Sequence, residues 1–225
     1  MTRPYCIIGC TRGTGLQIVR HLAARGTPVR CIARDPLKAQ NLLPAGGWCD
    51  LLPGGHYRPS CRPGLVKWLD AAKAVAFTGR FVLLSGMGSE LPSFTGRLLN
   101  AIKGNLQRNQ RDRDDYLRNS GLDWSIGRGG LLTDGAGGQA AIRITPPVHR
   151  LSLLRRLART DFARALIATA DTPAASGRMF DVFNEPGSSP TDEPLTRQFE
   201  CLRRATGAKQ VSPSFENAVV EQSCG

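Results

Sequence analysis

Short apolar runs alternate with helical apolar periods in the first part of the chain. An apolar run around residues 5–8 ends in glycine, which is typical of a buried parallel strand. Apolar residues then recur every three positions over residues 14–24, which predicts a helix with one buried face. Residues 29–33 predict a second strand, and Asp35-Pro36 is typical of a helix start with proline in the first turn.

The same alternation continues through most of the chain. Helices are predicted over residues 65–73, 97–119, 160–170 and 195–204, and strands over residues 81–84, 122–126 and 179–183. Strands that alternate with helices favour an α/β fold with a mainly parallel sheet. The sequence therefore predicts a doubly wound parallel sheet with helices on both of its faces.

Composition limits the class of protein. The chain has 225 residues, which fits one domain with an appended tail, and its 41% of hydrophobic residues can form a core. No run of about 18 apolar residues occurs, so no membrane-spanning helix is predicted. No signal or transit peptide is visible, so we expect a cytoplasmic protein, or an organellar one if a leader has been removed. The three histidines and seven cysteines lack the spacing of a metal site.

The charge balance suggests anionic ligands or partners. A net charge of +12 favours a phosphorylated ligand, an acidic protein partner or larger assembly, or nucleic acid, with a solvated arginine-rich surface as the alternative. Nucleic acid is least favoured, because only 6% of the residues are aromatic. Arginines surround leucines over residues 143–164. This pattern predicts either a basic amphipathic helix that docks on an acidic partner or an anionic membrane, or a solvated helix packed on the sheet.

A glycine-rich loop lies between the first predicted strand and the first helix. Gly9 permits the tight turn, Gly13 lets the backbone approach a pyrophosphate, and Gly15 lets the helix pack on the strand. The helix N-terminus then offers N–H groups and a positive partial charge to the phosphates. Because the loop has a strand before it and a helix after it, we interpret it as the dinucleotide-binding loop of a Rossmann-like domain.

The end of the second strand distinguishes the two nicotinamide dinucleotides. An acid at this place binds the ribose 2′-hydroxyl of NAD, whereas an arginine accommodates the 2′-phosphate of NADP. The chain has Arg34 followed by Asp35, with Arg12 as a second cation in the glycine loop. We interpret Arg34 as favouring NADP(H) over NAD; in the alternative, Asp35 only caps the next helix and Arg34 is solvated.

These residues resemble the atypical short-chain dehydrogenase/reductases. The likeness is to the NmrA-like proteins and to the NAD(P)-binding proteins similar to biliverdin reductase B and flavin reductase. The matching segments, spread over roughly residues 5–185 in family order, are 8–16, 33–36, 80–88, 115–128, 132–134 and 159–166. The resemblance implies an NAD(P)-binding Rossmann domain over residues 1–185, followed by a C-terminal helix and tail over residues 186–225.

The resemblance also implies a site. The residues that would line the pyrophosphate and 2′-phosphate side are Gly9, Thr11, Arg12, Gly13, Thr14 and Gly15. Arg34 would face the adenosine phosphate, and Asp50 looks like the acid after the third strand that contacts the adenine. Ser85 would lie beneath the nicotinamide, which makes it the catalytic candidate. Arg128 would belong to the segment after the next strand, with Gly129 where proline is usual.

Two departures from the family pattern bear on function. The usual short-chain enzyme protonates its substrate through a tyrosine with a lysine four residues on, but Tyr116 is followed at that spacing by Ser120. The family also has a helix and a fourth strand after the third strand, a unit that needs roughly 30 residues. Only about a dozen residues lie between Leu52 and Leu65, so the sheet is predicted to lack or shorten one inner strand unit.

Two functions remain. The first is an NADP(H)-binding atypical short-chain reductase that transfers hydride to a small carbonyl, quinone or flavin-like acceptor. The second is a non-catalytic protein of the same fold that serves as a redox sensor or as an accessory subunit of a larger complex. The glycine loop, Arg34 and Ser85 favour the first. The missing tyrosine–lysine pair, the missing strand and the charge favour the second.

Overall fold

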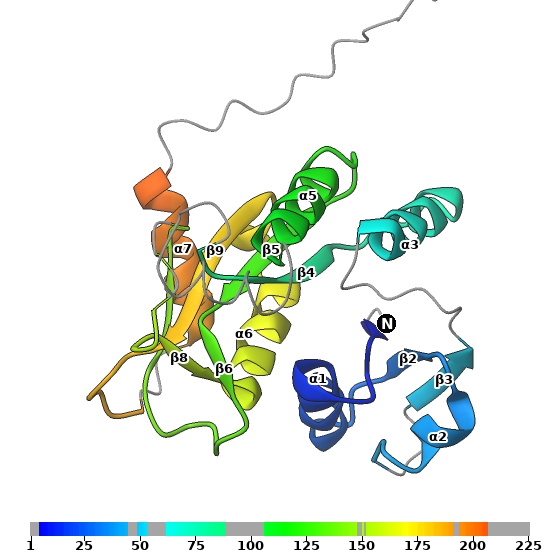
Figure 1. Cartoon of the computed structure of the whole chain (residues 1–225), viewed down its shortest axis with the longest axis horizontal. Helices are drawn as coiled ribbons and strands as arrows, with labels where there is room; N and C mark the ends of the chain where they lie inside the picture. Colours follow the sequence, from blue (N-terminus) through cyan, green and yellow to red (C-terminus); the bar gives the residue numbers. More distant parts are fainter. Residues whose placement is uncertain are drawn as a thin grey trace, which may run out of the picture.

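The computed structural model describes residues 5–44, 49–53, 62–88, 106–147, 150, 152–190 and 194–206. Within these ranges, strands alternate with helices for most of the chain, as the sequence predicts (Figure 1). The elements are β1 (Tyr5–Ile8), α1 (Gly13–Ala24), β2 (Val29–Ala33), α2 (Pro36–Gln40), β3 (Cys49–Pro53), α3 (Arg62–Ala74), β4 (Phe81–Gly86), α5 (Leu106–Arg118), β5 (Trp124–Gly129), β6 (Leu131–Thr133), β7 (Ile142–Thr145), β8 (Arg156–Ala158), α6 (Arg159–Asp171), the 3-10 turn η1 (Pro173–Ala175), β9 (Arg178–Asn184) and α7 (Leu195–Thr206). The α/β fold with parallel sheets is confirmed.

The strands form two main sheets that are not joined by strand pairing. One sheet has the order β1-β2-β3 and is parallel throughout. The other has the order β4-β5-β9-β7, and only β7 runs antiparallel to its neighbour. In the described part of the chain, β1 pairs only with β2 and β4 pairs only with β5. The predicted loss of an inner strand is confirmed for these residues; residues 54–61, on which part of that prediction falls, lie outside them.

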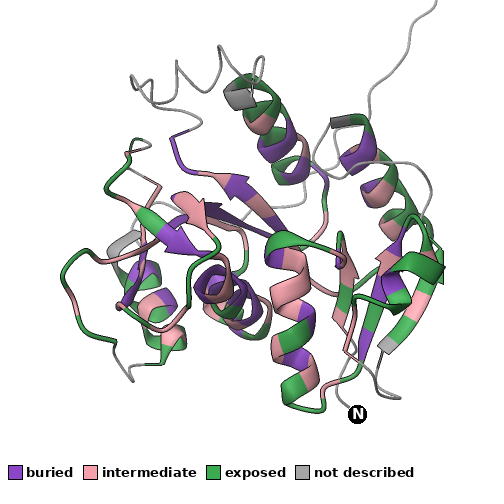
Figure 2. Ribbon diagram, turned by 60° about the horizontal axis from the view of Figure 1, so that its bottom comes forward, coloured by how far each residue is buried: buried purple, intermediate pink, exposed green. Residues whose placement is uncertain are grey.

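Helix packing connects the two sheets. Helix α1 lies against α6, and the side chain of Ile18 in α1 contacts the apolar clusters of both halves. Ile167 of α6 is buried in the N-terminal cluster beside Val19 and Leu22. Figure 2 shows buried residues along both helices. The apolar period predicted for residues 14–24 therefore serves to attach the N-terminal sheet to the rest of the protein.

Helices cover both faces of the larger sheet, as predicted. On one face, Leu69 of α3 and Leu117 of α5 pack with Leu83 and Ile126 of the strands. On the other face, Phe162 and Leu166 of α6 and Phe199 of α7 pack against the sheet. Their partners include Phe180 and Val182 of β9. The rings of Phe180 and Phe199 meet edge to face, with centroids 5.0 Å apart. Helix α7 is thus anchored to the sheet by a fully buried aromatic pair.

The basic helix predicted over residues 143–164 is wrong. The segment contains strand β7 and strand β8, and a helix begins only at Arg159. Ile142 and Ile144 point into the core at a spacing of two, which is the period of a strand rather than a helix. Arg155 lies over the ring of Phe183, 5.6 Å from its centroid, instead of lining a basic helical face.

Other boundaries also differ from the prediction, for example those of α5 and β5. Helix α5 covers residues 106–118 of the predicted 97–119, and residues 97–105 lie outside the described residues. Strand β5 runs over Trp124–Gly129 and ends three residues later than predicted, so Arg128 lies within the strand. Among the described residues, no helix has the length and apolarity needed to cross a membrane.

Replacing Phe199 with alanine should destabilise the fold by about 3–5 kcal/mol, since the ring is fully buried against Phe180 and its loss leaves a cavity. The free energy of unfolding is measured by urea denaturation followed by circular dichroism. Leu154→Ala is the matched control, because Leu154 is 77% exposed, and its change should stay within about 0.5 kcal/mol. Equal effects of the two substitutions would contradict the packing of α7 on the sheet.

Candidate functional site

The glycine loop joins β1 to α1 and has the geometry that its sequence predicts. Gly9 has a φ of +82°, in the left-handed region that favours glycine. A Cβ atom at Gly15 would lie 2.2 Å from the carbonyl oxygen of Gly9, so only glycine allows α1 to approach the end of β1 this closely. The loop therefore holds the first turn of α1 directly over the carboxyl end of the strand.

The first turn of α1 presents its backbone amides without a competing cap. Arg12 occupies the N-cap position with an extended backbone, its side chain makes no capping hydrogen bond, and the first turn contains no acidic residue. Thr14 is buried, Thr11 is half-buried, and Arg12 and Gly13 are exposed. A helix start of this kind attracts anions through its N–H groups and its dipole.

Asp35 caps a helix, as in the alternative weighed above. Its carboxylate accepts a hydrogen bond from the backbone N–H of Lys38 at 3.1 Å and forms an ion pair with the Lys38 ammonium at 3.4 Å. The hydrogen bond from this N–H is the main cause that holds the pKa of Asp35 below its usual range. Arg34, which is exposed directly after β2, is left as the cation at the place that distinguishes the two dinucleotides.

Arg159 is a neighbour of the glycine loop that sequence reasoning missed. It is the first residue of α6, and its Nε lies 3.7 Å from the position that a Cβ of Gly13 would occupy. Its guanidinium also forms an ion pair with the exposed carboxylate of Asp134. The contact arises because α6 packs on α1, which no local sequence pattern shows. Arg159 adds a third arginine to Arg12 and Arg34 around the candidate site.

The amino end of α6 also holds the carboxyl edge of the larger sheet. Asp161, in the first turn of α6, accepts hydrogen bonds from the side-chain amide of Asn184 and from the backbone N–H of Gly138, both at 2.9 Å. Asn184 is the last residue of β9, and its side-chain oxygen accepts a hydrogen bond from the Ala158 N–H at 2.9 Å. Since β4, β5 and β9 are parallel and in register, Ser85 lies near this same edge. Helix α6 thus contacts both the carboxyl edge of the larger sheet and the glycine loop.

Ser85 lies beside a buried carboxyl group. Its hydroxyl donates a hydrogen bond to Oδ2 of Asp114 at 2.8 Å, and the two residues are 3% and 2% exposed. In the described part of the chain, Oδ1 of Asp114 has no hydrogen-bond partner. Burial raises the pKa of Asp114 to about 6, although the Ser85 hydrogen bond and the nearby Arg113 and Arg128 lower it.

The inward position of Asp114 was not predicted. The alternation of Arg and Asp over residues 107–118 indicates an exposed, salt-bridged helix face, and the 3.3 Å ion pair between Arg118 and Asp115 fits that expectation. Arg113 and Asp114, however, are buried, and Arg113 donates a hydrogen bond to the carbonyl oxygen of Leu84 at 3.3 Å. The signal was the spacing from Leu117, which places Asp114 one turn earlier on the buried face of α5.

Two predicted site residues lie elsewhere than the resemblance implies. Asp50 lies within β3 rather than after it, is exposed, and pairs with Arg30 at 3.6 Å. Arg128 lies within β5 rather than after it, is fully buried, and forms an ion pair with Asp181 at 2.8 Å. The structure does not bring either to the glycine loop, and their contacts with a cofactor stay predictions.

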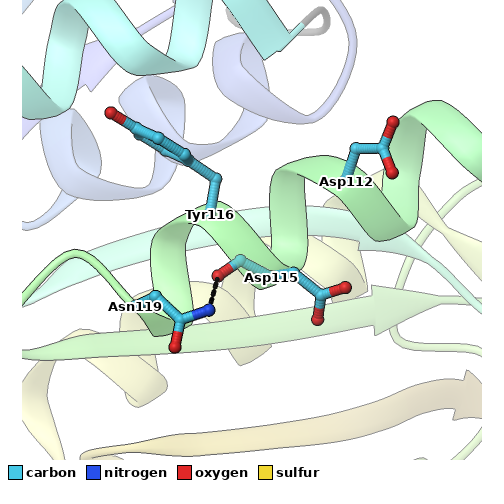
Figure 3. A pocket seen from close by; sticks show the side chains of 4 residues that line it. All are labelled: Asp112, Asp115, Tyr116 and Asn119. Carbon is cyan, nitrogen blue, oxygen red and sulfur yellow. Dashed lines mark hydrogen bonds between the residues drawn. The ribbon is translucent and has the colours of Figure 1, made fainter. Parts of the chain in front are cut away.

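A surface hollow on α5 contains none of the predicted site residues. It has a volume of about 260 Å³ and is lined by Asp112, Asp115, Tyr116 and Asn119 (Figure 3). The side-chain amide of Asn119 donates a hydrogen bond to the Asp115 carbonyl at 2.9 Å, which belongs to the helix itself. We therefore do not count this hollow as part of the site.

Comparisons with known proteins give the class. Residues 49–173, more than half of the chain, match the model of the NAD(P)H-binding family, so the chain belongs to that family. The expected membership of an NAD(P)-binding family is confirmed. The glycine loop precedes the matched segment, and its geometry is independent support for the same ligand class. No curated protein matches the sequence.

Solved structures show the same fold. The oxidoreductase ylbE from Lactococcus lactis superposes with a TM-score of 0.69 at 20% sequence identity, covering 90% of this chain and 97% of that one. A short-chain dehydrogenase/reductase from Veillonella parvula in complex with NADP gives 0.69 at 13% identity, with 86% and 99% covered. The anaerobilin reductase ChuY from Escherichia coli O157:H7 gives 0.64 at 18% identity, with 84% and 100% covered. The chain therefore has an NAD(P)H-binding, oxidoreductase-like Rossmann fold.

The glycine loop fits the phosphate end of such a dinucleotide. The close approach of α1 to the Gly9 carbonyl, which only glycine at position 15 allows, and the uncapped first turn of α1 together give the helix start that a pyrophosphate would need. The nicotinamide end would have fewer protein contacts. Among the described residues, no strand lies between β1 and β4 and pairs with both.

Gly15→Ala should destabilise the protein by about 1–3 kcal/mol and weaken dinucleotide binding, since the new methyl group must displace α1 from the Gly9 carbonyl. Thermal unfolding and cofactor titration measure the two effects. The control is Gly135→Ala, where the nearest atom to the new methyl group is 4.0 Å away and little change is expected. An unaltered melting temperature for Gly15→Ala would contradict the close approach of helix and strand.

Proposed function

We propose that the protein is an NADPH-dependent reductase of a small carbonyl, quinone or flavin-like acceptor. The choice of NADPH over NADH rests on the different contacts of two adjacent residues that follow β2. The carboxylate of Asp35 is engaged in capping α2, whereas the guanidinium of Arg34 is exposed. An arginine at this place suits a 2′-phosphate, whereas the acid beside it is already bound to Lys38.

The chain's own residues divide into two groups in this proposal. The glycine loop binds the pyrophosphate through backbone amides of Thr11, Gly13 and Thr14, with Arg12 and Arg34 on the 2′-phosphate. The bound nicotinamide supplies a hydride. Ser85 contributes the hydroxyl group near the reacting ring. Among similar structures, ChuY is a reductase of anaerobilin, which supports a conjugated small-molecule acceptor.

A second function is favoured by one feature of the sheets. In the described residues, the flanks of β1 and β4 that face the missing strand have no strand partner, so the nicotinamide end lacks a wall that the family has. A protein with an intact phosphate cradle and an incomplete ring site would sense or carry the dinucleotide without reducing an acceptor. With a net charge of +12, it could serve as an accessory subunit for an acidic partner.

Titration of the purified protein with NADPH and NADH, followed by nicotinamide fluorescence, separates these functions. We expect NADPH to bind at least about tenfold more tightly than NADH, and Arg34→Gln to weaken NADPH binding by about tenfold or more without changing NADH binding. Loss of a hydrogen bond to a charged phosphate has this magnitude. Arg20→Gln, an exposed arginine on α1 outside the loop, is the matched control.

Each alternative outcome points elsewhere. Equal affinity for the two dinucleotides would contradict the role of Arg34. Saturable NADPH binding with no turnover of aldehydes, quinones or flavins would favour the sensor or accessory protein. No binding at millimolar dinucleotide would contradict both reductase and sensor and leave the accessory subunit.

A further inference from the structure

We propose that Asp114 supplies, through the hydroxyl of Ser85, the proton that the oxygen of a carbonyl or quinone acceptor takes up on reduction. The proposal rests on the reductase function proposed above. The proposal limits the acceptor to compounds whose oxygen is protonated during the reaction. It also names a proton source in place of the tyrosine–lysine pair that short-chain enzymes usually have.

A proton source is needed because the usual one is missing. None of the three tyrosines is followed by a lysine four residues on. Tyr116, on the same helix as Asp114, lines the surface hollow beside Asp112 and Asp115 (Figure 3). The hydroxyl of Ser85 donates its hydrogen bond to Asp114. The group that protonates the acceptor therefore has to be a residue other than a tyrosine of this kind.

The geometry of Asp114 suits this task. Its Oδ2 is 2.8 Å from the Ser85 hydroxyl, and both side chains are almost completely excluded from solvent. Its Oδ1 is buried with no hydrogen-bond partner among the described residues, and an unpartnered carboxylate oxygen is costly to bury. Protonation of the carboxyl group removes this cost, so the fold itself favours the acid form.

The surrounding charges determine the pH up to which Asp114 stays protonated. Burial raises the pKa of Asp114 to about 6, and the exposed Asp115 raises it slightly. Three groups act in the other direction: Ser85 on β4 by its hydrogen bond, Arg113 on α5, and Arg128 on β5, which is itself paired with Asp181 on β9. A general acid is most effective when its pKa lies near the working pH, which is the range that this balance gives.

The proton transfer balances without a further reactant. The acceptor carbon would gain the hydride that bound NADPH supplies, which leaves the nicotinamide oxidised, and the C=O double bond becomes a C–O⁻ group. The Ser85 O–H bond breaks and its proton forms a new O–H bond on the acceptor. The Ser85 oxygen takes the proton of the Asp114 carboxyl group, which leaves a carboxylate that accepts the Ser85 hydrogen bond seen in the structure. Solvent then returns one proton to Asp114.

The first test needs no cofactor. Carboxyl carbon NMR of the ¹³C-aspartate-labelled full chain should show one aspartate that titrates with a midpoint near 6. Its signal should be missing in Asp114→Asn, and its midpoint should rise in Ser85→Ala, because the Ser85 hydrogen bond lowers the pKa. Asp112→Asn, on the exposed side of the same helix, is the control and should leave the midpoint unchanged. A midpoint near 4 for Asp114 would overturn the proposal.

The second test follows turnover of 4-nitrobenzaldehyde and 9,10-phenanthrenequinone with NADPH. In the wild-type protein kcat should fall as the pH rises through the pKa of Asp114, because the acid form is the active one. Asp114→Asn should lower kcat by about 10²–10⁴-fold and remove this pH dependence, with the Kd for NADPH unchanged. Ser85→Ala should also lower kcat, and an unchanged Kd for NADPH shows that each variant is folded.

The outcomes separate this inference from the function on which it rests. If the wild-type protein reduces either probe and Asp114→Asn retains the rate and its pH dependence, only the proton source is overturned. If the wild-type protein binds no NADPH, the reductase function fails and the proposal fails with it.

Discussion

The packing of α1 on α6 is the interaction on which the rest of the structure depends. In the described residues, no ladder of backbone hydrogen bonds joins the sheet that carries the glycine loop to the sheet that carries Ser85. Apolar contacts of Ile18 and Ile167 take over that role. They also bring Arg159 to the loop and fix Asp161 at the end of β9. The candidate site is thus assembled by a helix pair rather than by one continuous sheet.

Local patterns predicted the parts of the molecule whose structure is set locally. The glycine loop, the strand over residues 29–33 and the helix cap at Asp35 follow from steric and hydrogen-bonding rules within a few residues. The lack of an inner strand among the described residues was also predictable, because too few residues separate Leu52 from Leu65. The kind of fold and the geometry of the glycine loop therefore follow from the sequence.

Features set by tertiary contacts were missed or misplaced. Arg159 reaches the loop only because two helices pack, and Asp114 is buried on a helix whose composition is almost entirely polar. The short strands over residues 142–145 and 156–158 were misread as a helix, since their arginines and apolar residues fit both periods. Arg128, placed by analogy after its strand, is held inside it by Asp181. In each case, a distant partner decided between local alternatives.

In the part of the chain that the structure describes, no strand pairing joins the two sheets, and this affects the cooperativity of folding. Side-chain contacts between helices are less directional than a backbone ladder, so the N-terminal unit of β1, β2, β3 and α1 can open as a sub-global unit at a lower free energy than the larger sheet. A dinucleotide that touches both the glycine loop and the carboxyl edge of the larger sheet would link these two units. Ligand binding would then convert two loosely coupled folding units into one, and amide exchange in α1 would slow as the site fills.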